Sequence, residues 1–377
     1  MIIKTGLLAG IAGMMLAASP AAAQGRSDAA PRSGTPIANQ WICTFDGGQV
    51  QRSQVPERAN AAAQVAQGRV FHVYRNTIKG FAIRASQQGV TNMIQRNPWI
   101  RSCRQDRAVT LAPPPGKGPG GGGDTSGGQS TPWGIARVGG PGNSPSGTAW
   151  VIDSGIDLDH PDLNVDVGRS RDFTGSRSGP EDENGHGTHV AGTIAAINNG
   201  FGVVGVAPGA KVVAVRVLDR RGSGSYAGVI AGVDYVKGAG KPGDVANMSL
   251  GGPPDPDLDA AVIAASATVK MVLAAGNDGE DAAGHSPARA DGQNVYTISA
   301  IDQNDRLTSW SNYGLDVDYA EPGAGIESTW KNGGYNTISG TSMAAPHAAG
   351  ILLLGSIRSD GTASGDRDSR PDPIGTR

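Results

Sequence analysis

The chain has 377 residues, a formal net charge of −2 at pH 7 and 58 glycines. This near-neutral balance provides no basic field for nucleic acid, so we expect no nucleic-acid partner. Only 18% of the residues are charged, which together with the glycine content favours tight turns and a core of small apolar side chains. The length exceeds that of a typical single domain and predicts two.

The first residues have the pattern of an export signal. Lys4 precedes the apolar run 7–18, and the small residues 21–23 follow it. The run is too short to span a bilayer comfortably, so residues 1–23 are interpreted as a secretory signal peptide, with a retained membrane anchor as the alternative. We therefore expect a secreted protein, periplasmic or extracellular, without membrane association once the signal is cleaved.

Residues 36–110 have a pattern of their own and contain both cysteines. The expected strands cover 41–45, 70–74, 79–85 and 100–109, and the expected helices cover 57–67 and 90–95. This order predicts a small α+β domain of the ferredoxin-like, split-βαβ type. The first and last strands are neighbours in that topology, and export places the chain in an oxidising compartment. We therefore predict a disulfide between Cys43 and Cys103.

Residues 111–128 are rich in proline and glycine. Prolines gather at the start of this segment and glycines at its end, which predicts a linker that is first extended and then flexible. A phosphate-binding loop is the alternative. That interpretation lacks the strand that should lead into such a loop and the helix with Lys-Ser/Thr that should follow it.

From 129 to 356, apolar strands alternate with helices. The expected strands cover 148–153, 212–217, 245–250, 270–275 and 295–300, and the expected helices cover 189–197, 226–236, 258–267 and 344–354. Strands that are apolar throughout are buried on both faces. The pattern therefore predicts a three-layer α/β domain with a mostly parallel sheet and helices on both faces. Ligand sites in such sheets lie beyond the carboxyl ends of the strands.

Four polar residues in glycine-flanked segments are candidates for catalysis: Asp153, His186, Asn277 and Ser342. A serine is a poor nucleophile unless a histidine accepts its proton, and an aspartate can orient that histidine. An asparagine amide can donate to an oxyanion. Each residue alone also fits a turn or a helix cap. A metal held by His186 and His189 is a further alternative, although the glutamate of the zinc-protease signature is missing.

The segments around these residues resemble those of subtilisin-like serine proteases (subtilases, the peptidase S8 family). The matching motifs are Val151-Ile152-Asp153-Ser154-Gly155, His186-Gly187-Thr188-His189-Val190-Ala191-Gly192-Thr193 and Gly340-Thr341-Ser342-Met343-Ala344-Ala345-Pro346-His347. They occur in the family's chain order. The resemblance runs from about 129 to 354. It implies a serine endopeptidase with Asp153, His186 and Ser342 as its triad and Asn277 as an oxyanion donor.

The resemblance also implies where a polypeptide substrate binds. The expected contacts are Gly222, Ser223 and Gly224 on one edge, Ser249, Leu250 and Gly251 on the other, and Ala275 and Gly276 beside Asn277. The peptide would lie extended between the two edges and add a strand through backbone hydrogen bonds. Glu280, Asp281 and His285 border the expected pocket for the residue before the scissile bond, and the cleavage preference stays open.

Two further features follow from the same resemblance. Residues 70–74 and 79–83 resemble inhibitory prodomains, which implies that 36–110 covers the cleft and assists folding. The product would be a monomeric, self-inhibited zymogen that cleaves itself near Gly128. The loop 197–203 resembles a calcium loop, which implies a structural Ca²⁺ held by Gln129, Asp162, Ile197, Asn199, Phe201 and Val203. Carboxylate, amide and carbonyl oxygens suit this hard cation, and an ordinary glycine turn is the alternative.

The chain departs from the family pattern after Leu354. Residues 357–377 are polar, so we expect a disordered or loosely wrapped tail in place of a packed helix. Other classes remain open: a catalytically silent homologue used for binding, and a cell-surface structural protein. An esterase would need a Gly-x-Ser-x-Gly elbow, and the segment 340–344 lacks the last glycine.

Overall fold

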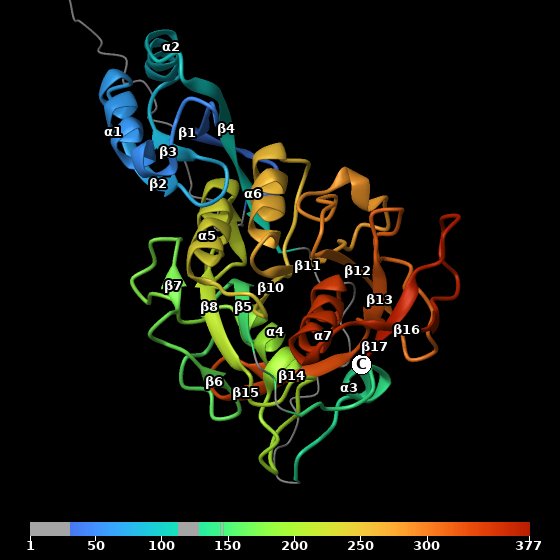
Figure 1. The fold of residues 1–377 in the computed structure, drawn as a ribbon. Helices are drawn as coiled ribbons and strands as arrows, with labels where there is room; N and C mark the ends of the chain where they lie inside the picture. Colours follow the sequence, from blue (N-terminus) through green and yellow to red (C-terminus); the bar gives the residue numbers. More distant parts are fainter. Residues whose placement is uncertain (1–30, 112–127, 144, 146) are drawn as a thin grey trace, which may run out of the picture.

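The computed structural model describes residues 31–111, 128–143, 145 and 147–377. The predicted signal peptide and nearly all of the predicted linker lie outside these residues. The described chain forms a small N-terminal unit and a larger α/β domain (Figure 1). No helix within the described ranges is both long and apolar enough to cross a membrane.

The N-terminal unit has the predicted split-βαβ order. Its elements are β1 (Pro36–Phe45), α1 (Val55–Val65), β2 (Arg69–Tyr74), β3 (Gly80–Arg84), α2 (Gln87–Arg96) and β4 (Ile100–Thr110), with a 3₁₀ turn at Arg52–Gln54. All its strand pairs are antiparallel, in the order β2-β3-β1-β4. Cys43 lies directly opposite Cys103 on β1 and β4, and the two form the predicted disulfide.

The larger domain contains the remaining elements. These are α3 (Trp133–Arg137), β5 (Thr148–Asp153), β6 (Asn164–Val165), β7 (Arg171–Asp172), α4 (His186–Ala195), β8 (Lys211–Arg216), β9 (Ser223–Ser225), α5 (Tyr226–Ala239), β10 (Val245–Met248), α6 (Pro256–Ser266), β11 (Lys270–Ala274), a 3₁₀ turn (Ala282–Gly284), β12 (Val295–Ile301), β13 (Tyr319–Pro322), β14 (Ile326–Trp330), β15 (Gly334–Ile338), α7 (Thr341–Leu354), β16 (Arg358–Thr362) and β17 (Pro373–Thr376). Its main sheet runs β16-β17-β13-β12-β11-β10-β5-β8-β6. Every pair in it is parallel except β16 with β17.

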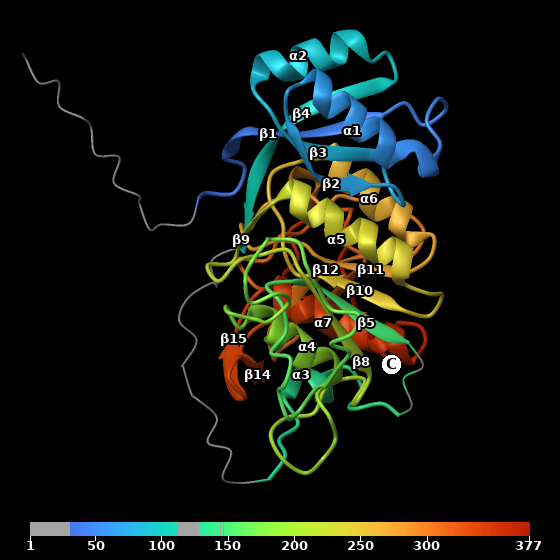
Figure 2. The same ribbon diagram turned by 90° about the vertical axis from the view of Figure 1, so that its left-hand side faces the viewer.

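Burial on both faces of the sheet follows from the side-chain alternation along a strand. On β5, Trp150 and Ile152 pack in a core with α5 and α6, whereas Ala149 and Val151 pack in a second core with α4 and α7. The helices therefore form two outer layers around the sheet, as the apolar strands predicted (Figure 2). The observed helix α7 begins at Thr341, three residues before the expected start.

The N-terminal unit lies against α5 and α6 of the larger domain (Figures 1 and 2). One face of its sheet packs on α1 and α2, and residues of the other face, including Ile42 and Tyr74, join the core of α5 and α6. The Tyr74 hydroxyl donates to the carbonyl of Ala227 at 3.0 Å. The carboxylate of Asp234 accepts from the backbone N–H groups of Asn76 and Thr77, both at 2.8 Å.

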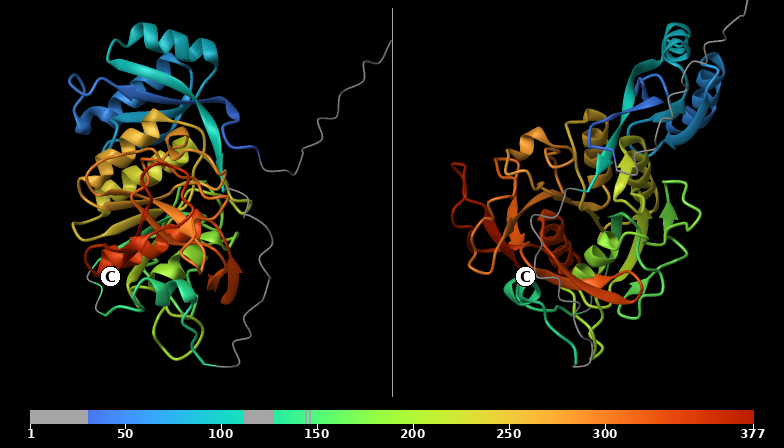
Figure 3. Two further views of the ribbon diagram at one scale, coloured as in Figure 1. Left: turned by 90° about the vertical axis from the view of Figure 1, so that its right-hand side faces the viewer. Right: turned by 180° about the vertical axis from the view of Figure 1, so that it is seen from behind.

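The expectation of a loose C-terminal tail is wrong. Strand β17 extends the sheet beyond β13, with Ile374 opposite Ala320, and β16 pairs with β17 (Figure 3). Ile374 and Asp372 are each only 1% exposed, and the Ser299 hydroxyl donates to the Asp372 carboxylate at 2.6 Å. A few buried contacts therefore hold the segment 357–377 against the sheet, although its average composition is polar and did not predict them.

Candidate active site

Asp153 and His186 form a buried hydrogen-bonded pair. Asp153 is the last residue of β5, and His186 is the first residue of α4. The Nδ1 atom of His186 lies 2.9 Å from Oδ1 and 3.0 Å from Oδ2 of Asp153. Because a carboxylate only accepts, Nδ1 carries the proton, and a neutral imidazole then has Nε2 as its acceptor.

Two glycines allow close packing at the start of α4. Gly185 has a φ of +112°, and a Cβ atom there would overlap the ring of Trp330 on β14. A Cβ atom on Gly187 would overlap the carbonyl oxygen of Gly155, just beyond β5. A side chain at Gly187 would therefore push the helix start away from the strand that carries Asp153, and one at Gly185 would push it away from Trp330.

The charges around His186 favour its protonated form. Burial lowers the pKa of His186, but the charge and hydrogen bond of Asp153 and the charge of Asp182 outweigh burial and raise it. His189 behaves differently: burial lowers its pKa to about 3, and its Nε2 lies 2.9 Å from the carbonyl oxygen of Ile326. The geometry therefore gives no support to a metal shared by His186 and His189.

Ser342 lies in the first turn of α7 with a buried side chain. Its hydroxyl donates to the carbonyl of Ser249 at 3.2 Å, and the Ser249 hydroxyl donates to the carbonyl of Ser342 at 2.8 Å. These reciprocal bonds join the chain beyond β10 to the start of α7. The N–H of Ser342 is among those that a helix N-terminus leaves without an intrahelical acceptor.

Asn277 is held with its amide nitrogen free to donate. Both the backbone N–H and the hydroxyl of Thr341 donate to Oδ1 of Asn277, each at 2.9 Å. This arrangement fixes which end of the amide carries the oxygen, because Thr341 needs an acceptor. Asn277 and Ser342 both line a cavity of about 440 Å³.

The end of β4 occupies the space between the two predicted substrate edges. Val109 and Thr110 lie opposite Gly224 and Ser223 of β9, and Thr110 forms a second antiparallel bridge with Gly251. One residue further, the N–H of Leu111 donates to the carbonyl of Gly222 at 2.9 Å. The predicted substrate edges therefore bind an extended chain in this structure, and Figure 2 shows β4 reaching down to β9.

The cavity beside Ser342 also has an ionisable wall. Leu250, Ala275 and Gly276, which the sequence predicts as substrate contacts, line it together with His285 and Glu280. The His285 ring lies 3.8 Å from Asp278 and 3.5 Å from Glu280. Asp281, the third residue that the sequence placed here, instead accepts from the N–H of Ala283 in the following 3₁₀ turn.

All six residues of the predicted calcium site meet at one place. The Nε2 atom of Gln129 lies 2.6, 3.2 and 3.0 Å from the carbonyl oxygens of Ile197, Phe201 and Val203, and 3.4 Å from Oδ1 of Asn199. The Asp162 carboxylate accepts from Asn199 at 3.0 Å and from the N–H of Val203 at 3.1 Å. Among the described residues no group of three His, Cys, Asp or Glu could hold a metal. A cation here would depend on carbonyl and amide oxygens with one carboxylate, which fits calcium.

Sequence reasoning missed three buried polar residues around the start of α4: Ser154, Asp182 and Arg216. Ser154 and Arg216 are 0% and 1% exposed, and Asp182 is 3% exposed. The available signal was position, since Ser154 follows Asp153 and Asp182 lies four residues before His186. Polar residues this close to a candidate catalytic pair, next to an apolar and therefore buried strand, are expected to be buried and hydrogen-bonded.

A sequence model of the subtilase family matches residues 150–357. The chain therefore belongs to the subtilase family, and it is a serine endopeptidase of the subtilisin type. The M-protease of Shouchella clausii (strain KSM-K16) is 44% identical over 286 residues, which are 74% of this chain and 69% of that protein. The alkaline serine exoprotease A of Vibrio alginolyticus is 37% identical over 338 residues, 84% of this chain and 60% of that protein.

A shorter relative and a solved structure agree with this assignment. Subtilisin Savinase of Lederbergia lenta is 44% identical over 234 residues, 60% of this chain and 84% of that protein. The crystal structure of a cold adapted subtilisin-like serine proteinase superimposes with a TM-score of 0.55 at 36% identity. That match covers 64% of this chain and 96% of the other chain.

Proposed function

We propose that this chain is a secreted, self-inhibited serine endopeptidase that cleaves peptide bonds through Asp153, His186 and Ser342. The observation that carries the proposal is the buried Asp153–His186 pair, in which a carboxylate holds Nδ1 and leaves Nε2 as the base. Ser342 lies at the start of α7, which packs against α4 in one core.

The proposed reaction follows the ordinary course of acyl transfer. The Ser342 hydroxyl, which donates to Ser249 in this structure, turns to His186, gives up its proton and attacks the carbonyl carbon of the scissile bond. The imidazolium, stabilised by Asp153, then protonates the leaving amine as the C–N bond breaks. Water, activated by the same imidazole, hydrolyses the acyl-enzyme and restores Ser342.

Asn277 and the start of α7 supply the oxyanion site in this proposal. The amide nitrogen of Asn277 is free because Oδ1 is engaged by Thr341, and the N–H of Ser342 needs an acceptor. Two donors that are fixed before the reaction stabilise the developing negative charge without rearrangement.

We further propose that residues 36–110 are an inhibitory prodomain and that the catalytic domain begins at 129 and continues to 377. Support for inhibition comes from Val109–Leu111, which take backbone bonds along Gly222–Gly224 and Gly251 that an extended substrate would need. Support for including residues 357–377 in the catalytic domain comes from β17, which pairs with β13 of the main sheet. The signal peptide, the processing near Gly128 and the monomeric state belong to the same proposal.

Calcium is proposed as a structural partner. Gln129, Asp162 and Asn199 would hold it with their side chains, and Ile197, Phe201 and Val203 with their carbonyl oxygens. A bound Ca²⁺ would neutralise the clustered oxygens and fasten the segment that starts at Gln129 to the loop 197–203. Its contribution is to stability and not to a reaction step.

Mass spectrometry of the purified protein, with and without Ser342→Ala, tests the proposal. The wild type should lose its N-terminal part by a cut near Gly128 and should hydrolyse casein. Ser342→Ala should stay at full length, apart from the signal, and should be inert. Equal processing and equal hydrolysis in both proteins would contradict the assigned nucleophile.

A further inference from the structure

The carboxylate of Asp182 accepts five hydrogen bonds around the start of α4. Its Oδ1 accepts from the Ser154 hydroxyl and from the N–H groups of Asn184 and Gly185, each at 2.9 Å. Its Oδ2 accepts from the N–H of Thr188 at 2.9 Å and from the Thr188 hydroxyl at 2.7 Å. Oδ1 and Oδ2 both accept from backbone N–H groups, so an amide in this place would set its hydrogens against one of those groups.

Ser154 connects this carboxylate with both members of the Asp153–His186 pair. Its backbone N–H donates to Oδ1 of Asp153 at 2.7 Å, and its hydroxyl accepts from the N–H of Gly187, next to His186, at 3.0 Å. The same hydroxyl donates to Asp182. A continuous chain of hydrogen bonds therefore runs from the Asp153 carboxylate through Ser154 and Asp182 into the first turn of α4.

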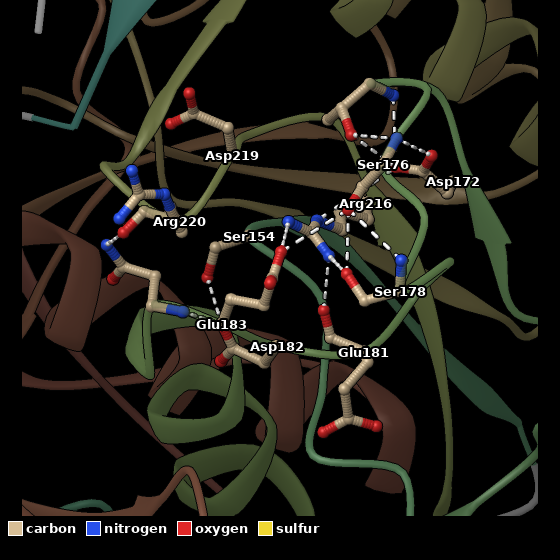
Figure 4. A network of polar contacts seen from close by, with 12 residues as sticks. Ser154, Asp172, Ser176, Ser178, Glu181, Asp182, Glu183, Arg216, Asp219 and Arg220 are labelled. Carbon is tan, nitrogen blue, oxygen red and sulfur yellow. Dashed lines mark hydrogen bonds and ion pairs between the residues drawn. The ribbon is translucent and has the colours of Figure 1, made fainter.

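Arg216 fixes the loop that carries Asp182. This buried arginine lies on β8 directly beside Asp153 of β5 in the strand register. Its guanidinium donates to the carbonyl of Glu181 and to the carboxylate of Glu183, both at 2.6 Å, and to the hydroxyl of Ser178 at 3.0 Å (Figure 4). The residues on both sides of Asp182 are thus tied to the strand next to the one that holds Asp153.

We propose that Asp182 is a positioning residue for the catalytic pair: through Ser154 and the first turn of α4 it fixes the His186 imidazole against Asp153, and it places a second negative charge near the imidazolium. This proposal rests on the proposed triad. Asp182 itself does not contact Asp153 or the reacting atoms. Asp182 acts on His186 in two ways: it holds the helix that carries His186, and its negative charge stabilises the imidazolium.

The charged and titratable groups facing this helix start come from several elements. They are Asp153 on β5, Asp157 after it, Glu181 and Glu183 in the loop, Arg216 on β8, His189 on α4 and Lys331 after β14. The Glu183 carboxylate is already bound to Arg216, and the Asp157 carboxylate accepts from Gly333 at 2.8 Å. Asp182 is the residue in this set whose carboxylate accepts from a backbone N–H in the first turn of α4, that of Thr188, whereas Asp153 is bound to the His186 side chain.

The test compares Asp182→Asn with Asp302→Asn. Asp302, in the turn after β12, accepts two hydrogen bonds from backbone N–H groups of its own turn, those of Asn304 and Arg306, and none from α4. For Asp182→Asn we expect kcat to fall on the order of ten- to a hundredfold with KM little changed, because a misplaced base slows chemistry more than binding. The acid limb of kcat/KM should move to lower pH by roughly half a unit to one unit, since a negative charge near the imidazolium is lost. Asp302→Asn should match the wild type.

A side-chain NMR titration of His186 separates this proposal from the proposed function. In Ser342→Ala, which cannot process itself, adding Asp182→Asn should lower the midpoint of the His186 titration, and adding Asp302→Asn should not. An unchanged midpoint together with wild-type kcat would overturn the positioning role, whatever reaction the site performs. Absence of hydrolysis in the wild type would instead contradict the triad.

Ser154→Ala provides a milder second variant if Asp182→Asn does not fold. It keeps the charge of Asp182 and removes the bridge to Gly187, so kcat should fall while the acid limb stays in place. Wild-type kcat in a folded Ser154→Ala would contradict the chain of hydrogen bonds on which the proposal depends.

Discussion

The two α/β units of this chain place their functional groups in opposite ways. In the larger domain, a parallel sheet buried on both faces collects polar side chains at its carboxyl edge, where Asp153 meets His186. In the N-terminal unit, an antiparallel edge strand offers only backbone, and the segment from Ala108 to Leu111 that reaches the cleft has no titratable side chain. The role of the larger domain therefore depends on the identity of a few side chains, whereas the role of the N-terminal unit depends on the backbone path of β4.

This difference predicts how each unit responds to substitution. Single side-chain changes at the polar carboxyl edge of the larger domain's sheet should remove activity and leave the fold intact. Changes in the N-terminal unit should alter how firmly it is held or how stable it is, and leave the chemistry unchanged.

Asp153→Asn should have the largest effect. Oδ1 of Asp153 accepts from both the N–H of Ser154 and Nδ1–H of His186, so the amide nitrogen of an asparagine would take the place of Oδ2, 3.0 Å from Nδ1. Its hydrogens would then face Nδ1–H and favour the other tautomer of His186. We expect turnover to fall about 10⁴-fold, which is the size of the loss measured for the same change in the chymotrypsin triad. Peptide hydrolysis measures it, and an unchanged thermal transition serves as the folding control. Turnover close to that of the wild type would refute the role of Asp153.

Asn277→Ala should come next. Loss of the amide donor removes one of the two oxyanion contacts, and the decrease in kcat should be roughly 10²–10³-fold, the range measured for subtilisin itself. The exposed Asn304 supplies the matched control, because Asn304→Ala removes an amide far from the cavity that Asn277 lines. Equal kcat for the two variants would show that Asn277 is not an oxyanion donor.

Asp234→Ala should loosen the N-terminal unit without touching the cleft. The Asp234 carboxylate accepts from the backbone of Arg75, Asn76 and Thr77, and its removal leaves these donors unpaired at the contact. We expect a loss of roughly 2–5 kcal/mol in the contact between the two units. Hydrogen exchange of residues 75–77 in a Ser342→Ala background should accelerate, whereas Asp46→Ala, in a turn of the same unit, should leave their exchange unchanged.

Removing the disulfide should destabilise only the N-terminal unit. Cys43 and Cys103 are 60 residues apart in sequence and link β1 to β4. The double change to serine should cost that unit about 2–4 kcal/mol. Calorimetry of the Ser342→Ala protein should show an earlier transition for the N-terminal unit and an unchanged one for the larger domain. A shift of both transitions together would mean that the two units unfold as one.

Asp372→Asn should change how the free energy of unfolding depends on pH. Burial raises the pKa of Asp372 to about 7 from the ordinary value of 3.8. A raised pKa means that the folded state binds the proton more tightly. The stabilising contribution of Asp372 is therefore fully present below about pH 4 and is lost as pH rises toward about 7, by at most about 1.4 kcal/mol per pH unit. Urea unfolding across this range should show a shallower slope in Asp372→Asn. An identical slope would mean that Asp372 does not titrate as a buried acid.

Much of the fold could be predicted from the pattern of apolar residues along the sequence. Apolar runs such as 148–153 predicted strands buried on both faces, and their carboxyl ends marked where Asp153 and Asn277 would lie. The cysteine pair followed from the order of the elements around it. These signals are strong because burial of a whole strand leaves no polar positions along it.

The rest depends on contacts that no local pattern displays. The segment 357–377 is polar on average, but its two strands and the buried Ala363, Asp372 and Ile374 attach it to the larger domain. Four of the five donors to Asp182 lie two to six residues after it, and folding brings the fifth, the Ser154 hydroxyl, from the end of β5. Buried polar networks of this kind depend on tertiary contacts, so the composition of the sequence does not predict them.

Labelling with a fluorophosphonate tests the central claim most directly, because the cleft that carries Ser342 also holds the end of β4. The full-length chain should react slowly, and the same protein should react fast once residues up to 128 are removed, with peptide mapping placing the label on Ser342. Equal labelling rates before and after removal, or a label on another residue, would contradict the claim that one cleft holds both the nucleophile and its inhibitor.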